Sequence, residues 1–255
     1  MIHDIDYYRK IQDARGATTQ KQAQVNSLRK KISLCFESTI NWELVEVNGV
    51  TQELLVMKST SVSVKKIEAR PGEILRLGSL IKWHGVYWLV TALDADDQIQ
   101  AAGTMTQCNT ILHWQMPDLS VVTTYAVTED ATKYGTGVSD NELMRIGEFA
   151  LKAKVQMNEQ TLQIHRDQRF LIGESGEGYT PNAYITSRIN LVTGTYVDIG
   201  ADQSEKNYGY IEVTLLEDQF RPHTDRADLM VADYVETDKN EPEQDETQNK
   251  GGVFW

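Results

Sequence analysis

Three aspartates in one short segment are the first residues in this sequence whose type and spacing could do chemistry. Asp94, Asp96 and Asp97 gather carboxylate oxygens, which are the ligands that Ca²⁺ prefers. The glycine and the terminal glutamate that complete an EF-hand loop do not follow them. The pattern therefore favours a solvated acidic loop, and we expect no metal site there.

A second candidate is the tripeptide His165-Arg166-Asp167, which combines a possible general base with a carboxylate. A catalytic role would need a nucleophile or a phosphate-binding loop in a recognisable context. The sequence contains no glycine-rich phosphate loop, no GxSxG and no HExxH. We therefore expect no enzymatic activity and no cofactor.

Cysteine and histidine are too sparse to form a metal centre or a disulfide framework. Cys35 and Cys108 are the two cysteines, and neither belongs to a CxxC pair. The five histidines show no ligand spacing. We expect both thiols to be free.

Aromatic side chains are concentrated in the first half of the chain and admit two interpretations. A row of aromatic rings on one face would bind carbohydrate by stacking. Tyr87 and Trp88 are adjacent on a predicted strand, so they face opposite ways and at least one belongs to a core. Core and subunit contacts are therefore favoured over a stacking surface for Trp42, Trp83, Tyr87, Trp88 and Trp114.

The composition is that of a globular protein of one large domain or two small ones. The chain has 255 residues, 40% of them hydrophobic, and a formal net charge of -12. This acidity argues against nucleic-acid binding, which needs clustered Lys and Arg. The apolar runs are too short to span a membrane, and the first residues do not resemble a secretory signal, so we expect an unexported chain.

Charge is distributed unevenly along the chain. Residues 1–35 hold seven basic and three acidic side chains, a net charge of +4, so the remaining residues total -16. A basic segment on an acidic body suggests docking on an acidic neighbour or on another copy of the chain; a solvated helix face is the alternative. The candidate interface residues in this segment are Arg9, Lys10, Arg29, Lys30 and Lys31.

The basic segment also contains a predicted helix. Thr19 and Gln22 form a capping-box pattern, and apolar residues then recur at helical spacing from Val25 to Phe36. This predicts a helix over residues 20–37, preceded by a hinged arm at Gly16. Residues 1–40 are therefore assigned to an N-terminal arm and an amphipathic helix.

Alternating strands and tight turns follow the helix. Asn48-Gly49 and His84-Gly85 each separate two strand-like runs, and Asn-Gly is the strongest short hairpin signal. About six strands with turns at each junction predict a small β-barrel or sandwich over residues 41–117. Pro117-Asp118 is the predicted domain boundary.

Further strand-like runs predict a second β-rich domain over residues 118–235. This part resembles the immunoglobulin-like or otherwise β-rich decorations that some virion proteins carry. The segment from Ser139 to Lys152 is undecided, because a capping pattern there competes with strand-rich surroundings. Residues 236–255 form an acidic tether too polar to fold alone. Phe254 and Trp255 follow it and are candidate anchors in a neighbour, although packing on their own domain is equally compatible.

The stretch from Gly78 to Gln115 resembles the barrel of tailed-phage head-closure proteins, also called stoppers or head-tail joining proteins. The opening residues, about 7–49, resemble virion structural proteins from the neck gene cluster of phages and prophages of Gram-positive bacteria. The resemblance covers about residues 5–115. The residues that carry the barrel pattern are Gly78, Trp83, Gly85, Tyr87, Trp88 and Asp94 to Asp97.

This resemblance implies a structural virion protein of the phage neck. Such proteins form homo-oligomeric rings, typically of twelve copies, between the portal-adaptor complex and the tail. A barrel loop can close the DNA channel, and the implied channel-facing candidates here are Asp94, Asp96 and Asp97. An acidic body would let DNA pass without specific binding.

The sequence is also compatible with two other functions. The chain could be another virion structural protein, such as a tail terminator, a tail-tube protein or a capsid decoration. It could also be a carbohydrate-binding module that acts through its aromatic residues.

Overall fold

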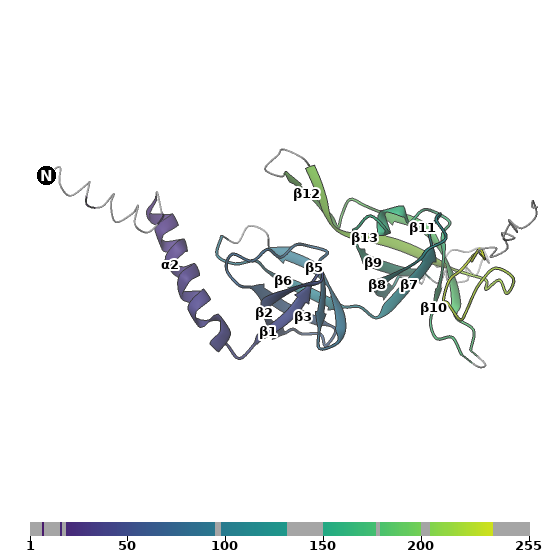
Figure 1. Ribbon diagram of the computed structural model, residues 1–255, viewed down its shortest axis with the longest axis horizontal. Helices are drawn as coiled ribbons and strands as arrows, with labels where there is room; N and C mark the ends of the chain where they lie inside the picture. Colours follow the sequence, from purple (N-terminus) through teal and green to yellow (C-terminus); the bar gives the residue numbers. More distant parts are fainter. Residues whose placement is uncertain are drawn as a thin grey trace, which may run out of the picture.

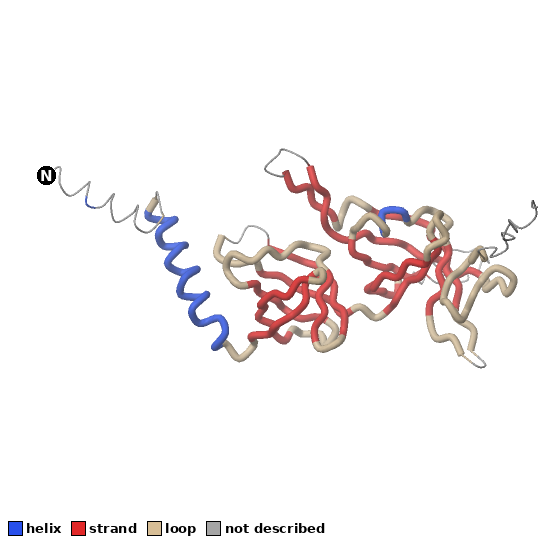
Figure 2. Tube along the Cα trace, viewed as in Figure 1, coloured by secondary structure: helices blue, strands red, loops and turns tan. Residues whose placement is uncertain are grey.

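The structure, a computed structural model, describes residues 7, 16, 19–94, 98–131, 150–176, 179–199 and 205–236. Across these residues the chain is mainly β, as predicted (Figure 1). Figure 2 shows the order along the molecule: helix α2 (Gln20–Cys35), then a first group of strands, then a second. No helix in the described residues is long and apolar enough to cross a membrane.

Helix α2 begins where the capping pattern predicts. The Thr19 hydroxyl accepts a hydrogen bond from the backbone N–H of Gln22 at 3.2 Å, which satisfies one of the donors at the helix start. The helix ends at Cys35, two residues before the predicted end, and continues into the short 3-10 helix η1 (Phe36–Ser38). The Phe36 side chain is buried and anchors this end of the helix.

The first domain is a closed six-stranded barrel with the strand order β1-β2-β3-β6-β5-β4. Inward-facing aliphatic side chains with Trp88 and Met105 fill its interior, as in other small barrels. The predicted β-barrel is confirmed. Its strands are β1 (Trp42–Val47), β2 (Val50–Lys58), β3 (Val64–Ala69), β4 (Leu80–Trp83), β5 (Val86–Asp94) and β6 (Ala102–Gln107).

Both predicted hairpin turns of this barrel are present. Asn48 and Gly49 have φ of 50° and 83°, and they join Val47 and Val50, which pair directly. His84 and Gly85 have φ of 50° and 78° and join β4 to β5 in the same way. Positive φ at both central positions is what a type I′ turn requires.

The second domain is a seven-stranded sheet with the order β10-β11-β13-β9-β8-β7, in which β12 pairs with β13. Its end strands β7 and β10 lie in contact, so the sheet nearly closes around an apolar core. The strands are β7 (Thr110–Gln115), β8 (Val121–Asp130), β9 (Ala150–Gln156), β10 (Arg169–Ile172), β11 (Asn182–Asn190), β12 (Thr195–Ile199) and β13 (Glu205–Asp218). The short 3-10 helix η2 (Thr161–Gln163) precedes β10.

This topology corrects the immunoglobulin-like alternative. An immunoglobulin-like domain packs two separate sheets face to face. Here one curved sheet encloses the core, because the 14-residue strand β13 pairs with β9 along one edge and with β11 along the other. Residues 150–152 of the undecided segment belong to β9, and the rest of that segment lies outside the described residues.

The structure also moves the domain boundary from Pro117 back to Asn109. Cys108 N–H donates to Tyr87 O of the barrel, whereas Asn109 N–H donates to Ala126 O of β8. Strand β7, assigned to the first domain from the sequence, therefore belongs to the second sheet and pairs with β8. Pro117-Asp118 is the turn between those two strands and not a linker.

Three kinds of contact join the two domains. The Tyr87 ring of β5 stacks on the Tyr125 ring of β8 with 3.7 Å between centroids. Gln156 donates a 2.7 Å side-chain hydrogen bond to Asn48 in the barrel. The Arg76 guanidinium lies over the Tyr208 ring of β13, 5.4 Å from its centroid. These contacts supplement the short connection at residues 108–109.

Residues 219–236 run from the end of β13 across the second sheet, and we call them the strap. Its residues Phe220, Met230 and Ala232 pack on Leu171 and Ala183 of β10 and β11. In Figure 1 the strap and β10 lie at the end of the molecule opposite α2.

Candidate functional site

The helix α2 is fastened to the barrel near its C-terminal end by Arg70. The Arg70 guanidinium contacts Glu53 at 2.6 Å and Glu37 at 3.2 Å, and it also donates to the backbone carbonyl of Ser33 at 3.3 Å. The buried Phe36 lies next to these contacts in the chain. The direction of the helix is therefore set at its base.

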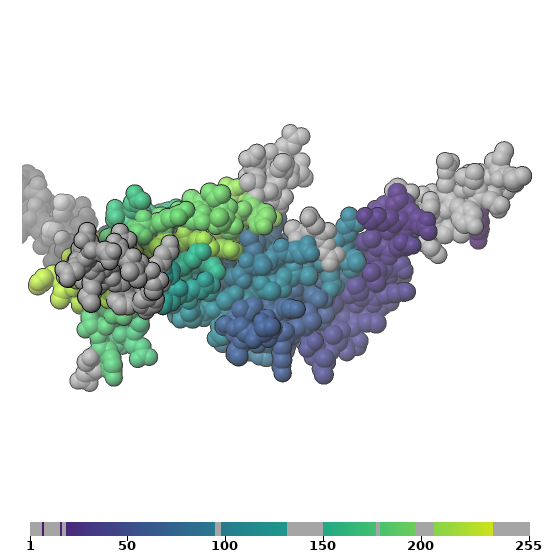
Figure 3. Space-filling model, turned by 180° about the vertical axis from the view of Figure 1, so that it is seen from behind, coloured from purple at the N-terminus to yellow at the C-terminus, as the bar shows by residue number. Residues whose placement is uncertain are grey.

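Beyond its base, α2 is poorly covered. None of its 16 residues, all of which the structure describes, is buried. Leu28 and Leu34 are 42% and 76% exposed. Val25 and Arg29 line a cleft beside Gln98, so this side of the helix faces the barrel. Lys31 and Leu34 lie on the other side, and Leu28, three residues from Val25, lies at the edge between the two. Figure 3 shows the helix alongside the barrel at one end of the molecule.

The structure divides the predicted basic cluster into two groups. Arg29 donates a 2.7 Å hydrogen bond from Nε to the backbone carbonyl of Gln98, so it contacts its own barrel. Lys30 and Lys31 are exposed and belong to the uncovered part of the helix. Arg9, Lys10, Phe254 and Trp255 lie outside the described residues.

The acidic loop is described only at its first aspartate. Asp94 is the last residue of β5, and Asp96 and Asp97 lie outside the described residues. Among the residues that are described, no three His, Cys, Asp or Glu side chains are grouped so that they could hold a metal ion.

The aromatic residues do not form one flat surface. Trp88 and Trp114 are 5% and 3% exposed and belong to the cores of different domains. Trp83 stacks on His84 at 4.4 Å, and Tyr87 is occupied by Tyr125 at the domain junction. The core interpretation is therefore confirmed for the two buried tryptophans.

The tripeptide His165-Arg166-Asp167 lies in the loop before β10. Arg166 Nε donates to the backbone carbonyl of Ser187 at 3.1 Å, and Asp167 has a φ of 68°. All three side chains are exposed. The Arg166 contact therefore has a structural role. Within the described residues, no contact joins a nucleophile to His165.

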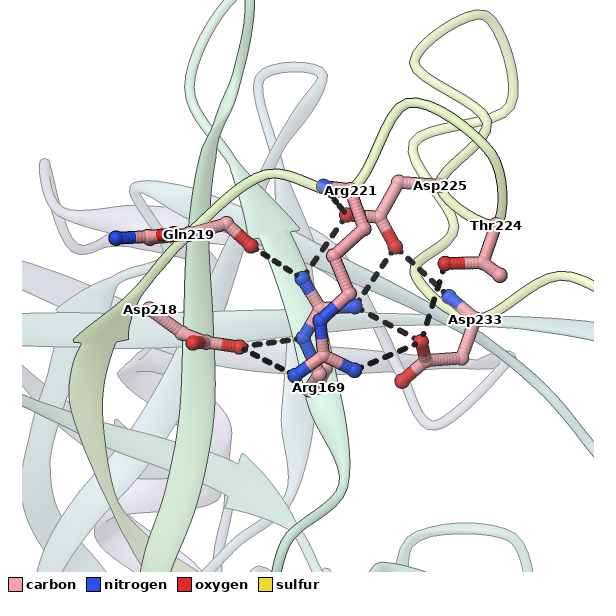
Figure 4. A network of polar contacts seen from close by, with 7 residues as sticks. All are labelled: Arg169, Asp218, Gln219, Arg221, Thr224, Asp225 and Asp233. Carbon is pink, nitrogen blue, oxygen red and sulfur yellow. Dashed lines mark hydrogen bonds and ion pairs between the residues drawn. The ribbon is translucent and has the colours of Figure 1, made fainter.

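A buried polar cluster that the sequence patterns did not identify lies next to this loop (Figure 4). The Arg169 side chain, 2% exposed, begins β10 and points toward the strap. Its guanidinium contacts Asp225 through both terminal nitrogens at 2.8 and 2.9 Å, and Asp218 and Asp233 at 2.6 and 2.9 Å. It also donates to the Gln219 carbonyl at 2.7 Å.

The electrostatics of this cluster favour the ionised carboxylates. Burial alone would raise the pKa of Asp225, but hydrogen bonds from Arg169 and from the backbone N–H groups of Arg221 and Asp233 outweigh it, so the pKa is lowered. Burial opposes ionisation of Asp218 too, yet bonds from Gln219 and Arg169 lower its pKa. The cluster has its donors and acceptors paired, so it suits a structural clamp on the strap better than proton transfer.

Comparisons with known proteins add little to this description. No family model matches the chain, and no curated protein matches it. Among solved structures, a match covers 78% of this chain and 85% of MrkH, described as a novel c-di-GMP-dependent transcription regulatory factor. The identity is 6% and the TM-score 0.22, so this likeness carries no argument about fold or function.

Proposed function

We propose that this chain is a structural virion protein of the phage neck. In this role it forms a homo-oligomeric ring, of twelve copies by resemblance, between the portal-adaptor complex and the tail. The ring lines or closes the DNA channel and performs no catalysis. The resemblance of the barrel segment to head-closure proteins supports a place at the head-tail junction. The exposed surface of the molecule, described next, supports oligomerisation.

The observation that carries the proposal is the uncovered helix α2. A 16-residue helix is marginal in water unless it packs an apolar face on a partner. The barrel holds the base of α2 but leaves Leu34 mostly, and Leu28 partly, exposed to solvent. A surface of this kind suits a protein whose partner is another subunit.

The distribution of charge also supports association between copies of the chain. All four charged residues of α2 are basic, whereas residues 109–236 hold 20 acidic and 10 basic side chains. Ends of opposite charge favour association between copies in a fixed direction. The acidic bodies would repel the phosphates of a passing duplex, so DNA would move through such a ring without being gripped.

Deletion of the gene from the phage tests the neck role. We expect lysates that contain heads without tails alongside free tails of normal length, seen by negative-stain electron microscopy. A plasmid copy of the intact gene should restore complete particles. Complete particles without the chain would contradict the proposal, and tails of altered length or heads lacking a surface protein would favour the tail or capsid alternatives.

A further inference from the structure

The described surface has a groove at the end of the second domain. It has a volume of about 370 Å³, at the lower end of the range for binding pockets. Three segments surround it: the β7–β8 turn, the loop that leads into β10, and the strap. The lining residues used below are Trp114, Met116, Leu119, Asp167, Asp233 and Val235.

Apolar side chains form part of this groove and acidic side chains lie at its rim, while His165, Arg169 and three glutamines line it as well. Leu119 and Val235 line it while remaining 38% and 57% exposed. Asp167 and Asp233 line it as well, and Asp233 is paired with Arg169 and Arg221. The exposed Asp118 and Glu236 directly follow lining residues in the chain, and Glu236 is paired with Arg226. Beneath the groove, Arg169 and Arg221 pair with three aspartates, Asp218, Asp225 and Asp233, so this cluster keeps a net charge of -1.

The uncovered side of α2 has the complementary chemistry. Leu28 and Leu34 supply apolar side chains, and Lys30 and Lys31 supply positive charge. A helix that lays apolar side chains in a hydrophobic groove is a common recognition mode, and opposite charges around such a contact favour the correct partner. The helix carries no acidic residue that would be repelled by the rim.

We propose, on the basis of the neck-ring function above, that α2 of one copy docks in this groove of the next copy. In Figure 1, α2 lies at one end of the molecule, and the strap and the start of β10, which line the groove, lie at the other end. One copy therefore does not place its own helix in its own groove. A contact between two different surfaces is heterologous, and repeated around an axis it closes a ring. The partner of α2 is thus the strap side of a second copy.

A disulfide between copies tests this contact directly. Cys35 is exposed at the end of α2, whereas Cys108 is partly buried, and this burial raises its pKa to about 12 and disfavours the reactive thiolate. In assembled particles of the Val235→Cys variant, oxidation with copper phenanthroline should produce a ladder of linked chains on non-reducing gels. The matched control Val62→Cys, at an 86% exposed residue of the barrel domain, should give no ladder.

The outcomes separate this inference from the proposed function. If the chain forms a neck ring but its Val235→Cys variant gives no ladder, the docking site is wrong and the proposed neck function still holds. Absence of the chain from the neck overturns both. A ladder from Val62→Cys and not from Val235→Cys would place α2 on the barrel of its neighbour.

Mixing two defective variants gives an independent test by native mass spectrometry. Lys30→Glu with Lys31→Glu disables the helix, and Val235→Lys disables the groove. Each variant alone should be monomeric, and their mixture should form heterodimers, because one intact helix and one intact groove remain. Rings formed by either variant alone would overturn the inference.

Discussion

Gly78 of the barrel and Gly209 of β13 meet backbone to backbone at the domain junction. A Cβ added to Gly78 would overlap the carbonyl group of Gly209, and the φ of Gly78 is +76°. The two domains therefore approach as closely as glycine allows. This contact and the Tyr87–Tyr125 stack hold the two β domains against each other.

The Gly78→Ala substitution should destabilise this junction. We expect a loss of about 3 kcal/mol in the free energy of unfolding, from overpacking against backbone and from the positive φ. Urea unfolding measures it. The matched control is Gly72→Ala, which has a φ of +100° and open space around the added Cβ, and it should lose only about 1–2 kcal/mol. Equal losses in the two variants would show that the close approach is unimportant.

Removal of the Arg169 side chain should release the strap. In Arg169→Met the buried Asp225 loses its charge partner, which costs about 3–5 kcal/mol. Urea unfolding should detect the loss, and limited proteolysis should cut first within residues 219–236. Arg226→Met, whose ion pairs with Asp228 and Glu236 are exposed, should lose far less stability than Arg169→Met. Resistance of the strap in Arg169→Met would argue against a clamp.

The same clamp predicts an acid dependence of stability. The folded-state pKa values of Asp218 and Asp225 are lowered, so their contribution is present above the unfolded pKa, about 3.9, and is lost as the pH falls through the folded pKa. The free energy of unfolding of the native chain should therefore decline below about pH 4. Asp225→Asn should start lower and decline less steeply. Parallel pH profiles would show that Asp225 does not contribute this dependence.

Charge reversal on the uncovered side of α2 should impair assembly without unfolding the chain. Lys30→Glu with Lys31→Glu changes two exposed side chains, so the free energy of unfolding should shift by less than about 1 kcal/mol. Incorporation into particles, measured by quantitative blotting, should fall at least tenfold. The control pair Lys58→Glu with Lys66→Glu makes the same charge change on the barrel and should assemble normally. Loss of incorporation in both pairs would point to net charge and not to the helix.

The helix start and the hairpin turns could be predicted from the sequence because each depends on a few neighbouring residues. The capping residues Thr19 and Gln22 mark the helix start, and the positive φ demanded at Asn48-Gly49 marks the first hairpin. Closure of the barrel was harder to predict, because it depends on strand pairing between residues distant in the chain, such as Glu46 with Lys82. Pro117-Asp118 gave a genuine turn signal, but a turn within a hairpin and a domain boundary share that composition.

The clamp could not be found from sequence patterns because its members are far apart in the chain. Asp218, Asp225 and Asp233 lie 49, 56 and 64 positions from Arg169. The available signal was an arginine directly before the apolar run Phe170 to Ile172, since a charge beside a buried strand needs a partner. The groove depends on the same long-range placement of the strap.

Cryo-electron microscopy of purified particles tests the neck-ring claim most directly. We predict a ring at the head-tail junction into which the barrel and the second domain fit as one body, with α2 of each copy reaching the strap side of the next. Density at that junction fully accounted for by other chains, with this chain in the shell or the tail, would contradict the account.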